Sequence, residues 1–129
     1  MGFAIVIRAE HTRAELVPFS EGSYEAINKT IGADYTDIIG VGSMRGVKWV
    51  MVADSVREFK PWCVVNEWAT LLRMFSNGSS HDVKGDVVLF GNTEGLSARA
   101  FSEQEARDLW AMFTARSGSF DSQLVAVAA

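Results

Sequence analysis

The sequence predicts an α+β fold, in which a mainly antiparallel sheet of about five strands carries three helices in the order β-β-α-β-β-α-β-α. Three observations predict this fold. Two pairs of short apolar segments are each joined by a polar turn, one central stretch changes from helical to strand periodicity, and a capping box begins a last amphipathic segment. The chain has 129 residues, and we expect a single domain at 1–116 followed by a tail at 117–129.

The first half of the chain contains two predicted hairpins. Residues 3–7 are apolar and rich in β-branched side chains, and residues 14–19 alternate loosely between apolar and other side chains. The two segments therefore predict a hairpin in which Pro18 belongs at an edge or at a strand end. Residues 35–41 and 47–53 predict a second hairpin around a glycine-containing turn.

A short helix is expected between these hairpins. Tyr24, Ile27 and Ile31 recur at helical spacing, Ser23 is available to cap the start, and Gly32 suits the residue just past the end. The helix has only about two turns, so it must depend on tertiary packing.

The stretch at 61–91 organises the rest of the chain. It predicts a helix in which Asn66 is the N-cap, followed by a strand at 87–90 that is buried on both faces. Four side chains at i, i+3, i+4 and i+7 form the expected buried face of the helix: Trp68, Leu71, Leu72 and Phe75.

The last predicted helix, at 103–116, begins at a capping box. Ser102 and Glu105 have the spacing at which each side chain accepts a hydrogen bond from the other residue's backbone N–H. The tail that follows ends in the uncharged segment 124–129. Alternating Val125 and Val127 favour an edge strand, and the alternative is a flexible end that resembles the apolar tags recognised by bacterial proteases.

Composition and charge exclude several function classes. A net charge of −4 argues against attraction to nucleic acid, which needs a dense cationic surface. No apolar run approaches the roughly 18 residues that span a membrane, and none resembles a signal peptide. The single cysteine, Cys63, cannot form an intrachain disulfide, so we expect a cytoplasmic location.

Two of the four tryptophans are candidate partner contacts. Trp49 lies in a strand whose faces the sequence does not assign, and Trp62 precedes the central helix beside Lys60. Because exposed tryptophan is enriched in protein interfaces, the sequence predicts that these three residues bind a partner, either another protein or a second copy of the chain.

The alternative site is a group of carboxylates. Asp82, Asp86 and Glu94 are expected to gather near one end of the predicted central strand, and paired carboxylates carry out acid and base chemistry when their pKa values are pushed apart. The sequence predicts no catalytic residue, metal site or cofactor, because it contains no ligand spacing of His and Cys and no nucleophile motif.

Four short segments carry a resemblance to a known family. The opening residues 4–7, the short helix ending in Gly32 with Tyr35 shortly after it, the pattern Asn66-x-x-Ala69, and residues 85–91 together resemble a family of small domains of unknown function. Members occur in bacteriophages, plasmids and other mobile elements of bacteria, often in actinobacterial hosts. The resemblance implies a small accessory protein of a mobile element, with no cofactor.

Two functions are therefore expected. The first is a noncatalytic accessory protein of a bacteriophage or other mobile element that binds a protein of the host cell. The alternative is a small-ligand-binding protein or enzyme with a cleft near Asp82, Asp86 and Glu94.

Overall fold

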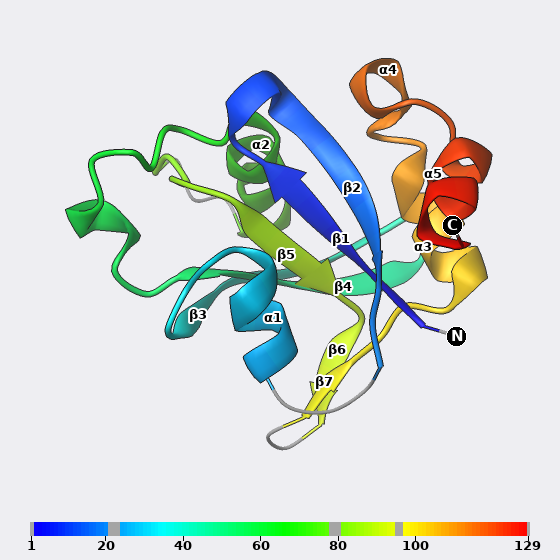
Figure 1. Cartoon of the computed structure of the whole chain (residues 1–129), viewed down its shortest axis with the longest axis horizontal. Coiled ribbons are helices and arrows are strands. Elements are labelled where there is room, and N and C mark those ends of the chain that lie inside the picture. Colours follow the sequence, from blue (N-terminus) through cyan, green and yellow to red (C-terminus); the bar gives the residue numbers. More distant parts are fainter. Residues whose placement is uncertain (1, 21–23, 78–80, 95–96, 129) are drawn as a thin grey trace.

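A computed structural model describes residues 2–20, 24–77, 81–94 and 97–128, and it confirms the predicted α+β fold (Figure 1). Five antiparallel strands form a sheet in the order β2-β1-β5-β4-β3. The strands are β1 (Phe3–Arg8), β2 (Arg13–Pro18), β3 (Thr36–Met44), β4 (Val47–Asp54) and β5 (Val87–Phe90). β6 (Asn92–Glu94) and β7 (Ser97–Arg99) form a separate small hairpin that the sequence analysis did not predict.

The helices cover both faces of this sheet. They are α1 (Glu25–Thr30), α2 (Glu67–Asn77), α3 (Glu103–Trp110), α4 (Thr114–Ser117) and α5 (Phe120–Ala128), with the 3-10 turns η1 (Glu10–Thr12) and η2 (Arg57–Phe59). Side chains of α2, α3 and α5 pack on one face, and α1 and the β6–β7 hairpin contribute to the core on the other. Figure 1 shows α3, α4 and α5 gathered at one side of the sheet.

The central strand explains why two cores form. Val87 and Leu89 of β5 belong to the larger core, whereas Val88 and Phe90 point to the opposite face and belong to the smaller one. Successive side chains of a strand alternate between faces, so an uninterrupted apolar strand needs a cover on each side. The prediction of a central strand buried on both faces is therefore confirmed.

Two elements, β3 and α1, end in turns at the glycines that the sequence analysis identified. The β3–β4 turn places both Arg45 and Gly46 at positive φ, the conformation that suits a two-residue hairpin turn. At the end of α1, the N–H of Gly32 donates to Lys29 and the N–H of Ala33 donates to Asn28, which is the Schellman pattern. The expected cap at Ser23 lies outside the described residues.

The prediction for α2 is half right. Asn66 is the N-cap, because its Oδ1 accepts a hydrogen bond from the N–H of Ala69 at 3.1 Å. Ala69 and Leu72 are buried, but Leu71 and Phe75 are exposed. Trp68 packs on the core beside Phe113, as predicted, but the inward face of the helix is shifted toward Ala69, Arg73 and Ser76.

The capping box is confirmed, but the helix after it is shorter than expected. Ser102 Oγ accepts from the N–H of Glu105 at 3.1 Å, and the Glu105 carboxylate accepts from the N–H of Ser102 at 3.0 Å. α3 ends at Trp110 rather than continuing to 116. A tight turn follows, and the Trp110 indole N–H donates to the Gly118 carbonyl at 2.9 Å.

The tail is neither a flexible end nor an edge strand, because most of it forms α5. Phe120 is buried against Trp110, with ring centroids 6.3 Å apart, and Leu124 and Val127 pack on the same core. These three residues follow the i, i+4, i+7 spacing of a helix, which the alternation of valines concealed. Ala129, the end of the expected tag, lies outside the described residues.

Adjacent leucines on α2 give a direct test of its orientation. Leu72 is 1% exposed and Leu71 is 48% exposed. Replacing Leu72 with Ala should lower the free energy of unfolding by about 2 to 5 kcal/mol, because the change leaves a cavity in the core. The matched change Leu71→Ala should cost less than about 1 kcal/mol. Urea denaturation of both variants makes the comparison, and equal losses would contradict the observed orientation.

Candidate functional site

A cavity of about 380 Å³ opens at one end of the sheet. β1 and β4 end there, while β2 and β5 begin there, so four strand ends place their side chains around one space. Its charged walls come from Arg8, Glu10, Arg13, Asp54, Lys60 and Asp86. We refer to it as the sheet-end cavity.

One wall of the cavity is a cluster around Arg8. Its guanidinium contacts Asp86 at 2.9 Å and Glu15 at 3.2 Å, and the second oxygen of Asp86 accepts from the N–H of Ala9 at 2.8 Å. Arg13 contacts the other oxygen of Glu15 at 2.9 Å. Burial opposes the charge of Arg8, but its hydrogen bonds to Asp86 and Glu15 raise its pKa. These charges therefore hold the ends of β1, β2 and β5 together.

The opposite wall centres on Asp54, the last residue of β4. Its carboxylate pairs with the Lys60 ammonium and accepts from the N–H of Val56 at 3.0 Å, while its carbonyl accepts from Arg57 at 3.1 Å. Burial alone would raise the pKa of Asp54, but the hydrogen bonds from Lys60 and Val56 outweigh it and lower that pKa. The hydrogen bond to Asp54 in turn raises the pKa of Lys60, so both groups stay charged at neutral pH.

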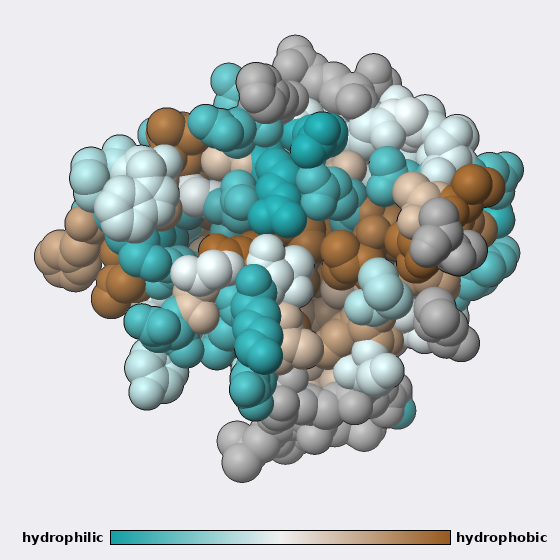
Figure 2. All heavy atoms as spheres, in the orientation of Figure 1, coloured by the Kyte–Doolittle hydropathy of each residue, from teal (hydrophilic) through white to brown (hydrophobic). Residues whose placement is uncertain are grey.

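Asp54 also anchors the segment that forms the rim of the cavity. We call residues 55–65, which connect β4 to α2, the 55–65 loop. It exposes five large apolar side chains: Val56, Phe59, Trp62, Val64 and Val65. Figure 2 shows brown and pale spheres meeting at the left-hand end of the molecule, where Figure 1 draws the green segment between β4 and α2. Phe59 is 86% exposed and Trp62 is 71% exposed, and the Trp62 ring also lines the cavity.

The 55–65 loop is held at several points. Backbone hydrogen bonds join Ser55 to Tyr35 at 3.0 Å and Gly85 to Val64 at 2.8 Å, and Lys84 contacts Glu58 at 3.3 Å. The ammonium of Lys60 lies 5.9 Å from the centroid of the Trp62 ring, within the range of a cation–π contact. The exposed aromatic rings therefore project from a braced loop.

The thiol of Cys63 lies in the cavity wall but is poorly suited to nucleophilic chemistry. Burial and then the Asp54 carboxylate raise its pKa, which keeps the thiol protonated. Within the described ranges, no group of three or more His, Cys, Asp or Glu is arranged to hold a metal ion. No helix among the described residues is long and apolar enough to cross a membrane.

The structure brings together residues from both predicted sites. Trp62 and Lys60, the expected partner contacts, line the same cavity as Asp86 from the alternative carboxylate group. Trp49 is wrongly assigned to a partner surface, because it is 1% exposed. Its ring packs beneath α2 beside Gly42, on the face where the odd-numbered residues of β4 point.

The three carboxylates do not form one cleft. Asp86 directly precedes β5, whereas Glu94 ends β6 beyond the other end of β5, and the Glu94 side chain lies outside the described part. Asp82 is exposed on the segment before β5 and does not line the cavity. Proximity in sequence misled the prediction, since a strand separates its two flanks by its own length.

The prediction also missed three residues that build the cavity, namely Arg8, Arg13 and Asp54. Each is a charged residue at the end of an apolar strand segment. That signal is present in the sequence, but only the antiparallel pairing of β1 with β2 and β5, and of β4 with β5, shows that these ends meet.

Comparisons of the chain with protein-family models, with curated proteins and with solved structures gave no match.

The lowered pKa of Asp54 predicts a pH-dependent contribution to stability. Because the folded pKa lies below the unfolded value of about 3.9, the contribution is present above that value and is lost as pH falls through the folded pKa. The wild-type free energy of unfolding should therefore decrease more steeply in acid than that of Asp54→Asn. Urea denaturation of both proteins from about pH 2 to 7 measures the difference, which should be largest near neutrality. A difference that does not change with pH would contradict the assignment.

Proposed function

We propose that this chain is a noncatalytic binding module that docks on another protein through the 55–65 loop. The observation that carries the proposal is the exposure of Phe59 and Trp62 on one loop. Exposing a large aromatic side chain to water costs free energy, and such side chains most often dominate the binding energy of protein interfaces. Their exposure together on one braced segment supports a docking role.

The bracing of the loop strengthens this proposal. Asp54 holds its start through Val56 and Lys60, and the hydrogen bond from Gly85 to Val64 holds its end. A loop that is already ordered loses little conformational freedom when it binds, so more of the interaction energy remains as affinity.

The charges of the sheet-end cavity support binding more than catalysis. Arg8 with Asp86, and Lys60 with Asp54, are ion pairs between wall residues, and the neighbouring thiol of Cys63 is protonated. These contacts order the walls of the cavity beside Trp62, and we propose that a side chain of the partner enters it. The net charge of −4 favours a partner with a basic surface, because opposite charges speed association.

The biological setting follows from the resemblance to mobile-element domains. We propose that the chain is an accessory protein of a bacteriophage or other mobile element, and that the partner is a protein of the bacterial host. This setting places the protein in the host cytoplasm.

A double variant tests the docking surface. Phe59→Ala with Trp62→Ala should abolish capture of the partner from bacterial host lysate, while the matched variant Phe75→Ala should keep it. Phe75 is 80% exposed on α2, so it controls for the loss of exposed aromatic surface. With the purified partner, calorimetry should show that the double variant loses about 2 kcal/mol or more of binding free energy, as hot-spot residues do.

Unchanged melting temperatures establish that both variants remain folded. Capture of the same proteins by the wild type and by the double variant would contradict the proposal. If only Phe75→Ala fails to capture the partner, the docking surface lies on α2 instead.

The sheet-end cavity also supports small-ligand binding as a second candidate function. Its volume of about 380 Å³ lies within the range of ligand sites, and Trp62 lines it beside charged groups. A thermal-shift screen of metabolites should then find a ligand that raises the melting temperature of the wild type and does so less for Trp62→Ala. A ligand with equal effects on both proteins binds elsewhere, and the absence of any shift would rule this candidate out.

A further inference from the structure

The two edge strands of the main sheet, β2 and β3, differ in whether other parts of the chain cover their outward backbone groups. At the β2 edge, the N–H of Ala14 donates to Ser117 Oγ at 2.9 Å and the N–H of Leu16 donates to Gln123 Oε1 at 3.1 Å. The next residue of β2 whose backbone points outward is Pro18, which has no N–H. Side chains from α4 and α5 therefore occupy the outward donors of β2, and this edge is closed to another strand.

The β3 edge has no comparable cover among the contacts of the described residues. Met44 and Val47 close the two-residue turn as a hydrogen-bonded pair, and such pairs alternate along an antiparallel ladder. Val41 and Ser43 therefore direct their backbone N–H and C=O groups away from β4. α2 packs on one face of β3, with Arg73 and Ser76 over Gly40 and Gly42, and it leaves this direction open.

Exposed apolar side chains follow the same edge. Ile38 pairs with Val52 and Val41 pairs with Val50, so both extend the smaller core toward the edge, where they remain exposed. A strand added alongside β3 would cover them.

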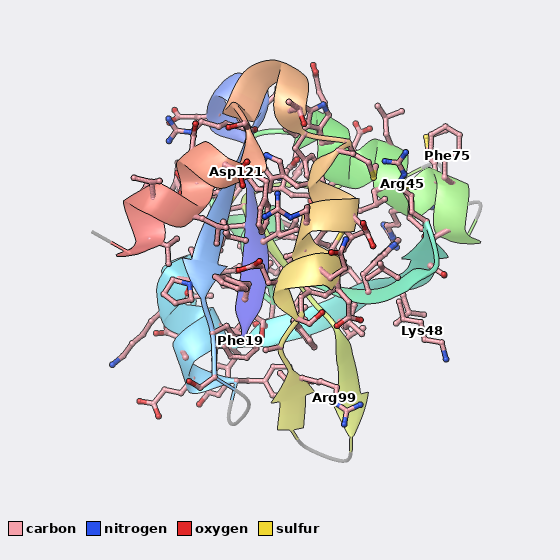
Figure 3. The ribbon with its side chains drawn as sticks, turned by 90° about the vertical axis from the view of Figure 1, so that its right-hand side faces the viewer. Phe19, Arg45, Lys48, Phe75, Arg99 and Asp121 are labelled. Atoms are coloured by element: carbon pink, nitrogen blue, oxygen red, sulfur yellow. The ribbon has the colours of Figure 1, made fainter. Side chains whose placement is uncertain are left out.

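The charges along β3 select the strand that fits. Asp37 lies near its start, whereas Arg45 lies just past its end and Lys48 lies on the neighbouring strand at the same end. Figure 3 shows Arg45 and Lys48 at the outer end of the β3–β4 hairpin. A second β3 strand in antiparallel orientation places each acidic end opposite a basic end, while a parallel one would oppose like charges.

We propose that two copies of this chain associate through β3, antiparallel about a two-fold axis near Val41, and so join their two sheets into one. In that register Val41 faces Val41 of the second copy, and the end of β3 that carries Asp37 lies beside the end of the second β3 that precedes Arg45. The axis makes the contact self-complementary, as in most homodimers. The inference does not rest on the proposed docking loop, which begins next to the start of β3 and exposes its aromatic side chains after β4.

The geometry also limits the strength of this dimer. A bulge between Ile38 and Gly40 interrupts the regular pairing of β3, so the straight part of the edge is short. Short ladders bury less area than a standard stable interface, and we expect an association that depends on protein concentration.

Charge reversal tests the register. Sedimentation equilibrium of the full chain should show a monomer–dimer equilibrium. Arg45→Asp should weaken the dimer by about tenfold or more, because it brings a carboxylate close to the acidic end of the second β3 strand, which carries Asp37. Asp37→Arg should do the same, and the double variant D37R/R45D should restore dimerisation. Asp tolerates the positive φ of Arg45, and Arg45→Asn provides an uncharged control in the same conformation.

Several outcomes would overturn the proposal. It fails if the wild type remains a monomer at every concentration, if neither single reversal weakens the dimer, or if the double variant does not recover. The variant F59A/W62A should dimerise like the wild type, and a loss of dimer there would assign self-association to the 55–65 loop instead. Circular dichroism verifies that each variant is folded.

Discussion

The buried amide of Asn66 connects the parts of this molecule that are farthest apart in sequence. Its Nδ2 donates to the carbonyl of Ile7 at 2.9 Å and to that of Gly85 at 3.0 Å, while its Oδ1 accepts from the first turn of α2. Its backbone N–H donates to Val83 at 2.7 Å. One side chain thus ties the end of β1, the approach to β5 and the start of α2, and an unpaired buried polar group would be costly at any of these points. The sheet-end cavity depends on this junction, because it brings Asp86 beside Arg8 and fixes the end of the 55–65 loop.

Much of the fold was predictable because its signals are local. The two hairpins, the central strand and both helix caps rest on patterns within about ten residues, where turn chemistry and alternation act directly. The orientation of α2 was not predictable from the spacing of its residues. The predicted face consists of Trp68, Leu71, Leu72 and Phe75, and the inward set that contains Ala69 and Leu72 has the same helical spacing. Only the approach of the helix to glycines of β3 decides between them: a side chain at Gly42 would lie 2.7 Å from Ser76. The prediction of an edge strand in the tail was wrong for a related reason, because small apolar residues satisfy both the strand period and the helix period.

The candidate site was less predictable than the fold. Trp62 and Lys60 were identified from composition and position, and Asp86 was identified as part of a different group. Arg8, Arg13 and Asp54 join them only through strand pairing across the sheet, which no local pattern records. The same limit explains the error at Trp49, since the face of a strand is set by what packs on it rather than by its own residues.

The closure of the β2 edge by α4 and α5 has a consequence for assembly. A sheet with one open edge can add one neighbour, after which the pair is complete. A sheet with two open edges can add neighbours without limit and grow into a filament. Ser117 and Gln123, which occupy the outward donors of β2, therefore determine whether growth of this sheet terminates. By covering one edge, α4 and α5 prevent native molecules from polymerising edge to edge.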